Sequence, residues 1–251
     1  MPLRRLPLLL RLLTALRAGC SNDATAQRAP GAPVTTAEAG VLAQVLYADF
    51  QHGGADFTVS APFAKTAVLT LTGEIDFSRG IGRAQGVTTY TDGQAEQTRT
   101  LFFTDKDLWQ GGVPGLAEAL TAAGLPAATY VRRPITTTNA SGTASLLDVL
   151  VQMVGRLAAR TADDPRSFQG YTWAGSQSVN GQLASVFRSG TGARIAVAAE
   201  SKLLVQYVTT LQDFDVTITL SDHGNREIPL PADTDTVDTT QHPEIATALG
   251  L

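Results

Sequence analysis

The sequence predicts an α+β fold with a curved, largely antiparallel sheet that covers an apolar interior. Apolar and polar residues alternate with strand period in two separate groups, each interrupted only by short polar breaks. Before and between these groups, apolar residues recur at helical spacing instead. The order is therefore helix, strands, helices, strands and a polar tail, which is typical of an α+β chain rather than of alternating βα units.

The second strand group gives the clearest signal. Residues Phe214–Leu220 alternate without a break, which predicts one apolar and one polar face. The group begins at Gly170, and its short connections predict an antiparallel meander. The strands expected in it are Leu183–Arg188, Gly192–Glu200, Leu203–Leu211 and Phe214–Leu220.

The first strand group lies between the two helical regions. A proline at position 62 is expected to end its first strand. The strands expected in it are Asp56–Ala61, Thr66–Phe77, Ile81–Tyr90, Ala95–Thr104 and Asp107–Gln110. Gly80, Gly82 and Gly86 miss the spacing of a dinucleotide-binding fingerprint and are interpreted as a bend or bulge.

Three segments carry helical patterns. Thr35 and Glu38 have the spacing of a capping box, and Gly53-Gly54 end the helix that follows. Gly115–Ala123 is a short helix, and Thr143–Ala159 has the strongest apolar face. Beyond these helices and strands, Ile228-Pro229-Leu230-Pro231 is expected to cross the rim of the sheet in extended form, and Thr234–Thr240 to be loose.

Composition bounds the class of protein. Of the 251 residues, 43% are apolar and 17% charged, which suits a globular chain with a sizeable core. The first 19 residues hold four arginines and no acid, so the remainder has 15 basic and 23 acidic residues, a formal charge of −8. Such an acidic body disfavours nucleic acid as a partner. No window offers the roughly 20 apolar residues of a membrane-spanning helix.

The N-terminus has the outline of an export signal. Residues 1–19 combine a charged start with a leucine-rich stretch, and Cys20 follows as the only cysteine. Leu16-Arg17-Ala18-Gly19-Cys20 resembles a bacterial lipobox, although Arg17 occupies a position where an aliphatic residue is usual. The alternative is an uncut Arg-rich N-terminus in which Cys20 is a chance thiol.

These patterns divide the chain into four parts. Residues 1–19 are the expected signal peptide, and residues 20–35 the lipidated cysteine with a flexible tether. Residues 36–232 are expected to form the folded domain, and residues 233–251 a polar tail.

The order of the elements and their pattern of apolar and polar residues resemble those of the mycobacterial LppX/LprG-type lipoproteins and, more distantly, of the lipoprotein carrier LolA. A cysteine and tether precede an amphipathic helix. The strand with Leu69-Thr70-Leu71-Thr72-Gly73-Glu74-Ile75 leads into Gly80-Ile81-Gly82, and a helical insert divides the two strand groups. The final strand, Val216–Leu220, leads through Ser221-Asp222-His223-Gly224 into a tail marked by Pro229 and Pro231.

The resemblance implies a half-barrel sheet wrapped around helices, with a cavity for acyl chains. It implies a non-enzymatic protein without a cofactor that binds and carries an acylated lipid or a lipoglycan. Anchored through Cys20, it would lie on the extracytoplasmic face of the cell membrane. The sequence names no protein partner.

Apolar faces supply the candidate cavity residues, because an acyl chain needs burial rather than charge. These candidates are Leu69, Leu71, Ile75, Phe77, Leu101, Phe103, Leu147, Leu150, Val154, Val216 and Ile218. The alternative is that they pack on one another. The protein would then be an envelope interaction or sensor module with a filled core.

Other constellations point less clearly to chemistry. His52, His223 and His242 have no second ligand at zinc spacing, and no G-x-S-x-G nucleophile elbow occurs. The acidic run at residues 233–238 lacks the glycine and glutamate of a calcium loop. Arg132-Arg133 is a candidate contact for an anionic headgroup, with a solvated loop as the alternative.

Overall fold

One 12-stranded sheet runs through the described chain. The computed structural model describes residues 28–136 and 145–251; the expected signal peptide and Cys20 lie outside them. Along the sheet the strands follow the order β12-β6-β5-β4-β3-β2-β1-β11-β10-β9-β8-β7. Every neighbouring pair is antiparallel except β12 and β6. The predicted α+β class with a largely antiparallel sheet is therefore confirmed, whereas the half-barrel curvature stays a prediction.

The first strand group forms one half of this sheet. Its members are β1 (Gly54–Ala64), β2 (Ala67–Asp76), β3 (Ile81–Tyr90), β4 (Gln97–Phe103), β5 (Asp107–Gly111) and β6 (Tyr130–Pro134). The prediction that Pro62 ends β1 was wrong. The strand runs on to Ala64, and Pro62 pairs with Val68 at a register shift beyond the last β1–β11 pair. A proline is tolerated there because one side of the strand needs no donor.

The second group forms the other half. Its members are β7 (Thr172–Val179), β8 (Gln182–Arg188), β9 (Arg194–Ala198), β10 (Leu204–Leu211) and β11 (Phe214–Ser221). The sequence predicts a meander from Gly170 but not β7 as a separate strand. The two groups meet where β1 pairs with β11, with Val59 opposite Ile218.

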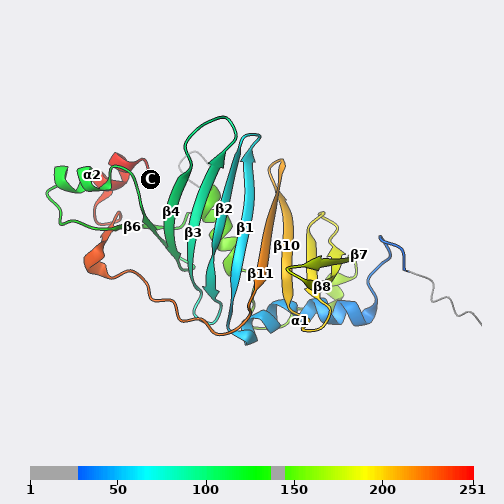
Figure 1. The fold of residues 1–251 in the computed structure, drawn as a ribbon. Helices are drawn as coiled ribbons and strands as arrows, with labels where there is room; N and C mark the ends of the chain where they lie inside the picture. Colours follow the sequence, from blue (N-terminus) through cyan, green and yellow to red (C-terminus); the bar gives the residue numbers. More distant parts are fainter. Residues whose placement is uncertain (1–27, 137–144) are drawn as a thin grey trace, which may run out of the picture.

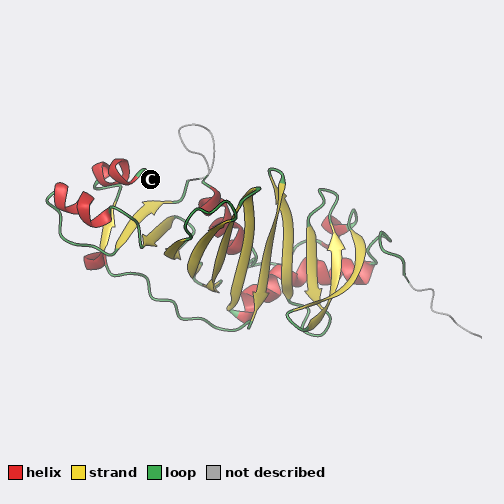
Figure 2. Ribbon diagram, turned by 45° about the horizontal axis from the view of Figure 1, so that its top comes forward, coloured by secondary structure: helices red, strands yellow, loops and turns green. Residues whose placement is uncertain are grey.

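Two helices, α1 (Thr36–His52) and α3 (Leu146–Gly155), lie against one face of the sheet (Figures 1 and 2). The predicted capping box of α1 is present, with Thr35 and Glu38 bonded reciprocally, and Gly53 ends the helix at φ 92°. The described part of α3 is shorter than the predicted helix, whose first two residues, 143 and 144, lie outside the described chain. Both helices pack on the alternate residues of β1 that point inward, among them Phe57 and Val59.

The end of the expected tether is ordered. Gly31 N donates to Trp173 O at 2.7 Å, and Trp173 N donates to Ala32 O at 2.8 Å. Arg28 forms an ion pair with Glu38 of α1. This part of the tether therefore lies along the start of β7 rather than moving freely.

A small second assembly forms at the other end of the sheet. The helices α2 (Leu116–Ala122) and α4 (Pro243–Leu249) lie side by side there (Figure 1). The strand β12 (Thr236–Asp238) pairs with β6, after the short 3-10 helix η2 (Asp233–Asp235). The expectation that Thr234–Thr240 is loose was wrong, because Val237 is buried in a small apolar cluster with Ile245.

The connection from β11 to this assembly passes along the ends of the strands (Figure 1), as predicted for Ile228–Pro231. Ile228 is fully buried and pins the connection in place.

The glycines of β3 serve close packing and not a bulge. Gly80 lies in the turn before β3 at φ 65°, as the predicted bend requires. The strand itself pairs with both neighbours without a register shift, so a bulge at Gly82 or Gly86 was wrong. A side chain at Gly82 would overlap the ring of Phe103, which is buried against Phe57 with ring centroids 6.2 Å apart. Gly82 thus makes room for an aromatic pair in the core.

We predict that Gly82→Ala lowers the free energy of unfolding by about 1–3 kcal/mol, because the added methyl forces the Phe103 ring to move. Urea denaturation measures the change. Gly40→Ala is the control, since nothing lies within 4 Å of a methyl there and alanine favours the α1 helix. Equal stabilities of the two variants would contradict this role of Gly82.

Candidate functional site

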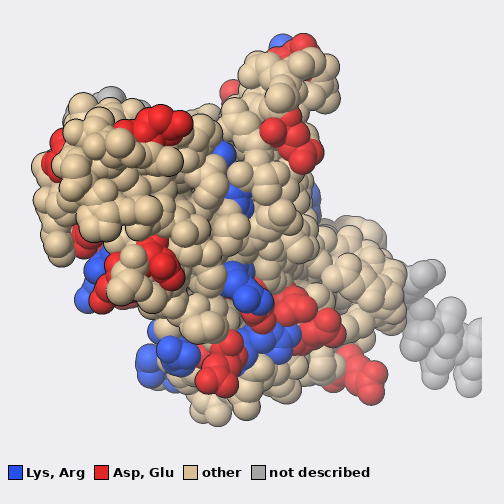
Figure 3. All heavy atoms as spheres, turned by 60° about the vertical axis from the view of Figure 1, so that its left-hand side comes forward, with Lys and Arg blue, Asp and Glu red and all other residues tan. Residues whose placement is uncertain are grey.

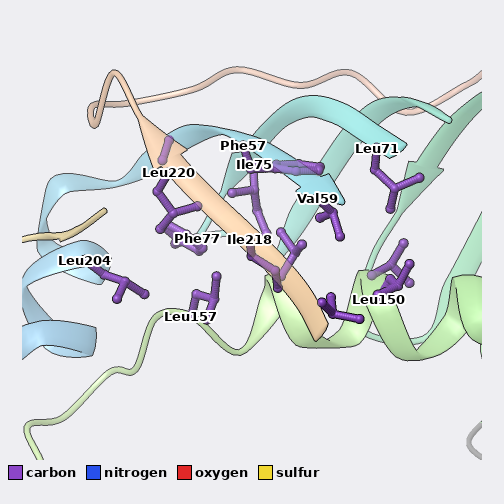
Figure 4. Packing of buried hydrophobic residues seen from close by; sticks show 14 of the residues in the cluster. Phe57, Val59, Leu71, Ile75, Phe77, Leu150, Leu157, Leu204, Ile218 and Leu220 are labelled. Atoms are coloured by element: carbon purple, nitrogen blue, oxygen red, sulfur yellow. The ribbon is translucent and has the colours of Figure 1, made fainter. Parts of the chain in front are cut away.

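The predicted cavity residues all lie in the main apolar cluster, on the sheet face that α1 and α3 cover (Figure 4). Nine are buried, while Leu69 and Leu147 are partly buried at its margin. In Figure 4, Val59 of β1 lies between Leu71 of β2 and Ile218 of β11, in agreement with the register of the three strands. The structure brings these residues together, but none of them lines the apolar pockets described next. Their contact with a lipid stays a prediction.

An apolar pocket of about 520 Å³ opens between α1, α3 and the strands β9 and β10. Leu42, Val45 and Leu46 line it from α1, at the i, i+3, i+4 spacing that places side chains on one helix face. Val149 and Met153 line it from α3 at i, i+4. The rest of the wall consists of Arg156, Leu157, Asp163, Phe168, Tyr171, Ile195, Leu204, Tyr207, Thr209 and Leu211.

A second apolar pocket of about 360 Å³ adjoins the first. The two share Val149 and Leu211 as wall residues, so they lie next to each other along α3, and we call them together the groove. The second pocket reaches the end of β1, where the Phe63 ring is 39% exposed. This groove offers apolar surface that the two helices leave uncovered.

Polar groups gather at one side of the main pocket. Asp163 and Arg156 are exposed there, while Tyr171 and Tyr207 are half-buried. Burial, then neighbouring Tyr207 and the carboxylate of Asp163, raise the pKa of the Tyr171 phenol. The Tyr171 phenol therefore stays neutral at physiological pH, and the pocket has an apolar interior with a polar margin.

The opposite face of the sheet differs in chemistry. Its hollow of about 610 Å³ lies over β1, β2, β3 and β4 and is lined mainly by polar side chains. Arg83 pairs with Glu74 at 2.6 Å, and Arg226 pairs with Asp56 at 2.9 Å. These groups satisfy one another. Figure 3 likewise shows acidic and basic side chains interspersed on the face that it presents.

The two arginines considered for a headgroup have partners within the fold. Arg133 forms a two-pronged ion pair with the fully buried Asp148 of α3, with one contact at 2.9 Å. Arg132 pairs with Asp107 at 3.1 Å and lies over the Trp109 ring. Both interpretations of this pair, a headgroup contact and a solvated loop, were therefore wrong. The two arginines instead form ion pairs that hold β6 against α3 and β5.

A buried acid and a histidine meet where α1 ends. Asp49 Oδ1 accepts a hydrogen bond from Leu204 N at 3.2 Å and lies 3.6 Å from His223 Nε2. Neither Asp49 Oδ2 nor His223 Nε2 has a hydrogen-bond partner among the described residues. Burial raises the pKa of Asp49 from 3.8 to about 8, opposed by the Leu204 N–H. Burial, then neighbouring His52, lowers the pKa of His223. Both groups are therefore neutral near pH 7.

Within residues 28–136 and 145–251, no three histidine, cysteine or acidic side chains gather as metal ligands. In the same ranges, no helix has the length and hydrophobicity to cross a membrane.

Sequence reasoning missed the residues of the main pocket because it chose the most regular apolar faces. Those faces meet one another and fill the centre of the core. The pocket forms beside them, where helix residues face a loop that brings in Phe168 and Tyr171. The helical spacing of Leu42, Val45 and Leu46 was visible in the sequence, but the contribution of the loop was not.

The fold and the pocket define an α+β protein with an open antiparallel sheet and an apolar groove under its helices. No family model matches the sequence, and no curated protein matches it. Among solved structures, it is similar to the crystal structure of LprF from Mycobacterium bovis. That alignment covers 80% of this chain and 100% of LprF, at 13% identity and a TM-score of 0.46.

We predict that Asp49→Asn changes how stability depends on pH. Because the folded pKa of Asp49 is raised, its contribution to stability is complete below about pH 4 and is lost as pH rises through about 8. The loss reaches about 1.4 kcal/mol per pH unit within this window. The asparagine can still accept from Leu204 N but does not titrate. Urea denaturation at pH 5 and pH 8 should therefore show the variant gaining stability relative to the parent at the higher pH. If the unfolding free energies of the two proteins changed in parallel with pH, the raised pKa of Asp49 would be refuted.

Proposed function

We propose that this chain is a non-enzymatic, lipid-binding envelope lipoprotein that carries an acylated lipid or lipoglycan. The observation that carries the proposal is the apolar pocket of about 520 Å³ between α1, α3 and the strands β9 and β10. Its volume lies within the roughly 300–1,000 Å³ typical of ligand sites, and its wall is mainly aliphatic and aromatic.

The energetics favour an alkyl chain as the occupant. Each methylene transferred from water to an apolar wall contributes roughly 0.8 kcal/mol. The pocket wall includes Leu42, Leu204 and Leu211, and the adjoining groove extends the same apolar surface to Phe63. A long alkyl chain can therefore follow the groove with its polar end at the margin near Asp163.

The arrangement of the sheet and the N-terminal sequence support two further parts of the proposal, the half-barrel and the lipid anchor. The open sheet with both helices on one face supports a half-barrel around the lipid site within residues 36–232. The lipobox-like sequence before Cys20 supports an anchor on the extracytoplasmic face of the cell membrane. A tethered carrier of this kind would bind a lipid at the membrane and transfer it onward.

One observation favours a second candidate, an envelope interaction or sensor module. Leu71, Leu150 and Ile218, which were expected to line a cavity, are at most 1% exposed and pack together. This part of the core is filled. The two candidates differ in whether the neighbouring pocket holds a lipid in the purified protein.

We predict that Met153→Trp abolishes binding of a fluorescent fatty-acid analogue while the protein stays folded, because the indole fills space in the pocket. Leu150→Trp, one turn earlier on the same helix, is the matched control. Its side chain is fully buried, so the larger ring should cost about 1–3 kcal/mol of stability instead. Unchanged probe binding by folded Met153→Trp would contradict the location of the site.

We also predict that Cys20→Ala releases the protein from the membrane fraction, because the thiol that would carry the lipid is lost. Fractionation of cells that express each form, followed by immunoblotting, measures the effect. Ser21→Ala is the control and should remain with the membranes. Identical fractionation of parent and Cys20→Ala would refute the anchor but leave the lipid pocket untouched.

A further inference from the structure

Three aromatic rings and one carboxylate meet at the polar margin of the main pocket. We call this set of residues, Phe168, Tyr171, Tyr207 and Asp163, the aromatic corner. The rings of Phe168 and Tyr171 are tilted by 58° with centroids 5.1 Å apart. Tyr171 N also donates to Phe168 O at 3.0 Å, which fixes the turn that carries both rings. Tyr207 comes from β10, so the corner joins a loop to the sheet.

The charge of the corner is negative. Asp163 is its one carboxylate, and burial, Tyr207 and Asp163 together raise the pKa of the Tyr171 phenol, so that this phenol adds no charge. Among the described residues, no side-chain hydrogen bond or ion pair engages the Asp163 carboxylate or the two phenol oxygens. These oxygen atoms can therefore accept hydrogen bonds from a ligand. Aromatic faces carry negative potential and attract a cation, and an ammonium group over such faces is a favoured ligand.

A positive group completes the margin of the pocket. Arg156, at the end of α3, lines the same pocket. It forms no ion pair with Asp163 in the described chain, so the two charges do not neutralise each other. A headgroup that bears both an ammonium and a phosphate would meet an opposite charge for each.

We propose that the aromatic corner binds the ammonium group of a lipid headgroup of the phosphocholine or phosphoethanolamine kind. This inference rests on the lipid-binding function proposed above and names the class of ligand. The alkyl chain enters the apolar groove, the ammonium lies against the rings and Asp163, and Arg156 faces the phosphate. A free carboxylate in place of this headgroup would be repelled by Asp163.

The test compares three amphiphiles with alkyl tails of similar length: dodecylphosphocholine, glycerol monolaurate and laurate. Binding to the purified protein is measured by isothermal titration calorimetry below the critical micelle concentration of each. We expect dodecylphosphocholine to bind at least about tenfold more tightly than either of the others. Asp163→Asn and Tyr207→Leu should each remove most of this preference.

Two further variants separate the corner from a general effect on folding. Tyr207→Phe keeps the ring face and should keep the preference, whereas Tyr207→Leu should not. Asp215→Asn removes an exposed carboxylate that pairs with Arg194 outside the pocket, and it should change nothing. Equal affinity for all three amphiphiles, or a preference for laurate, would overturn the aromatic corner and leave lipid binding intact. Absence of binding by all three would overturn both proposals.

Discussion

The pairing of β1 with β11 is the constraint on which the rest of the structure depends. It joins strands separated by the whole helical insert and so fuses two meanders into one sheet. Because both strands alternate strictly, the pairing aligns Phe57, Val59 and Ile218 on a single apolar face. That face is too extensive for α1 and α3 to cover completely. The uncovered part lies between the middle of α1, the second half of α3 and the strands β9 and β10.

The same constraint explains why the pocket and the filled core lie side by side. Over the central strands, side chains of β1, β2, β11 and α3 form one buried cluster, in which Leu71, Leu150 and Ile218 are fully buried (Figure 4). Over β9 and β10, the two helices leave the pocket open, and the segment with Phe168 and Tyr171 forms the remaining wall. A loop brings hydroxyl and carboxylate groups to that wall. The pocket thus acquires both an apolar interior and a polar margin, which suits an amphiphile.

The spacing of apolar residues along the chain predicted the helices and strands better than any other feature of the sequence. The unbroken alternation of Phe214–Leu220 and the capping box at Thr35 predicted β11 and α1 nearly to their observed ends. Strands with little apolar content were missed: β6 contains two arginines and a proline, and the middle of β7 is Gly-Ser-Gln-Ser. The pocket was missed for another reason. The position of the helices decides which apolar residues pack against a helix and which line a pocket. Residue type alone does not encode that position.

We propose that the groove beside α1 and α3 holds a guest with an alkyl chain. Native mass spectrometry of the protein, purified gently from the cells that produce it, detects such a guest. We expect a fraction whose mass exceeds that of the chain by the mass of a lipid, which is released on collisional activation and identified in a solvent extract. A protein that repeatedly carries no such adduct, and that takes up none when incubated with lipid vesicles, would contradict it.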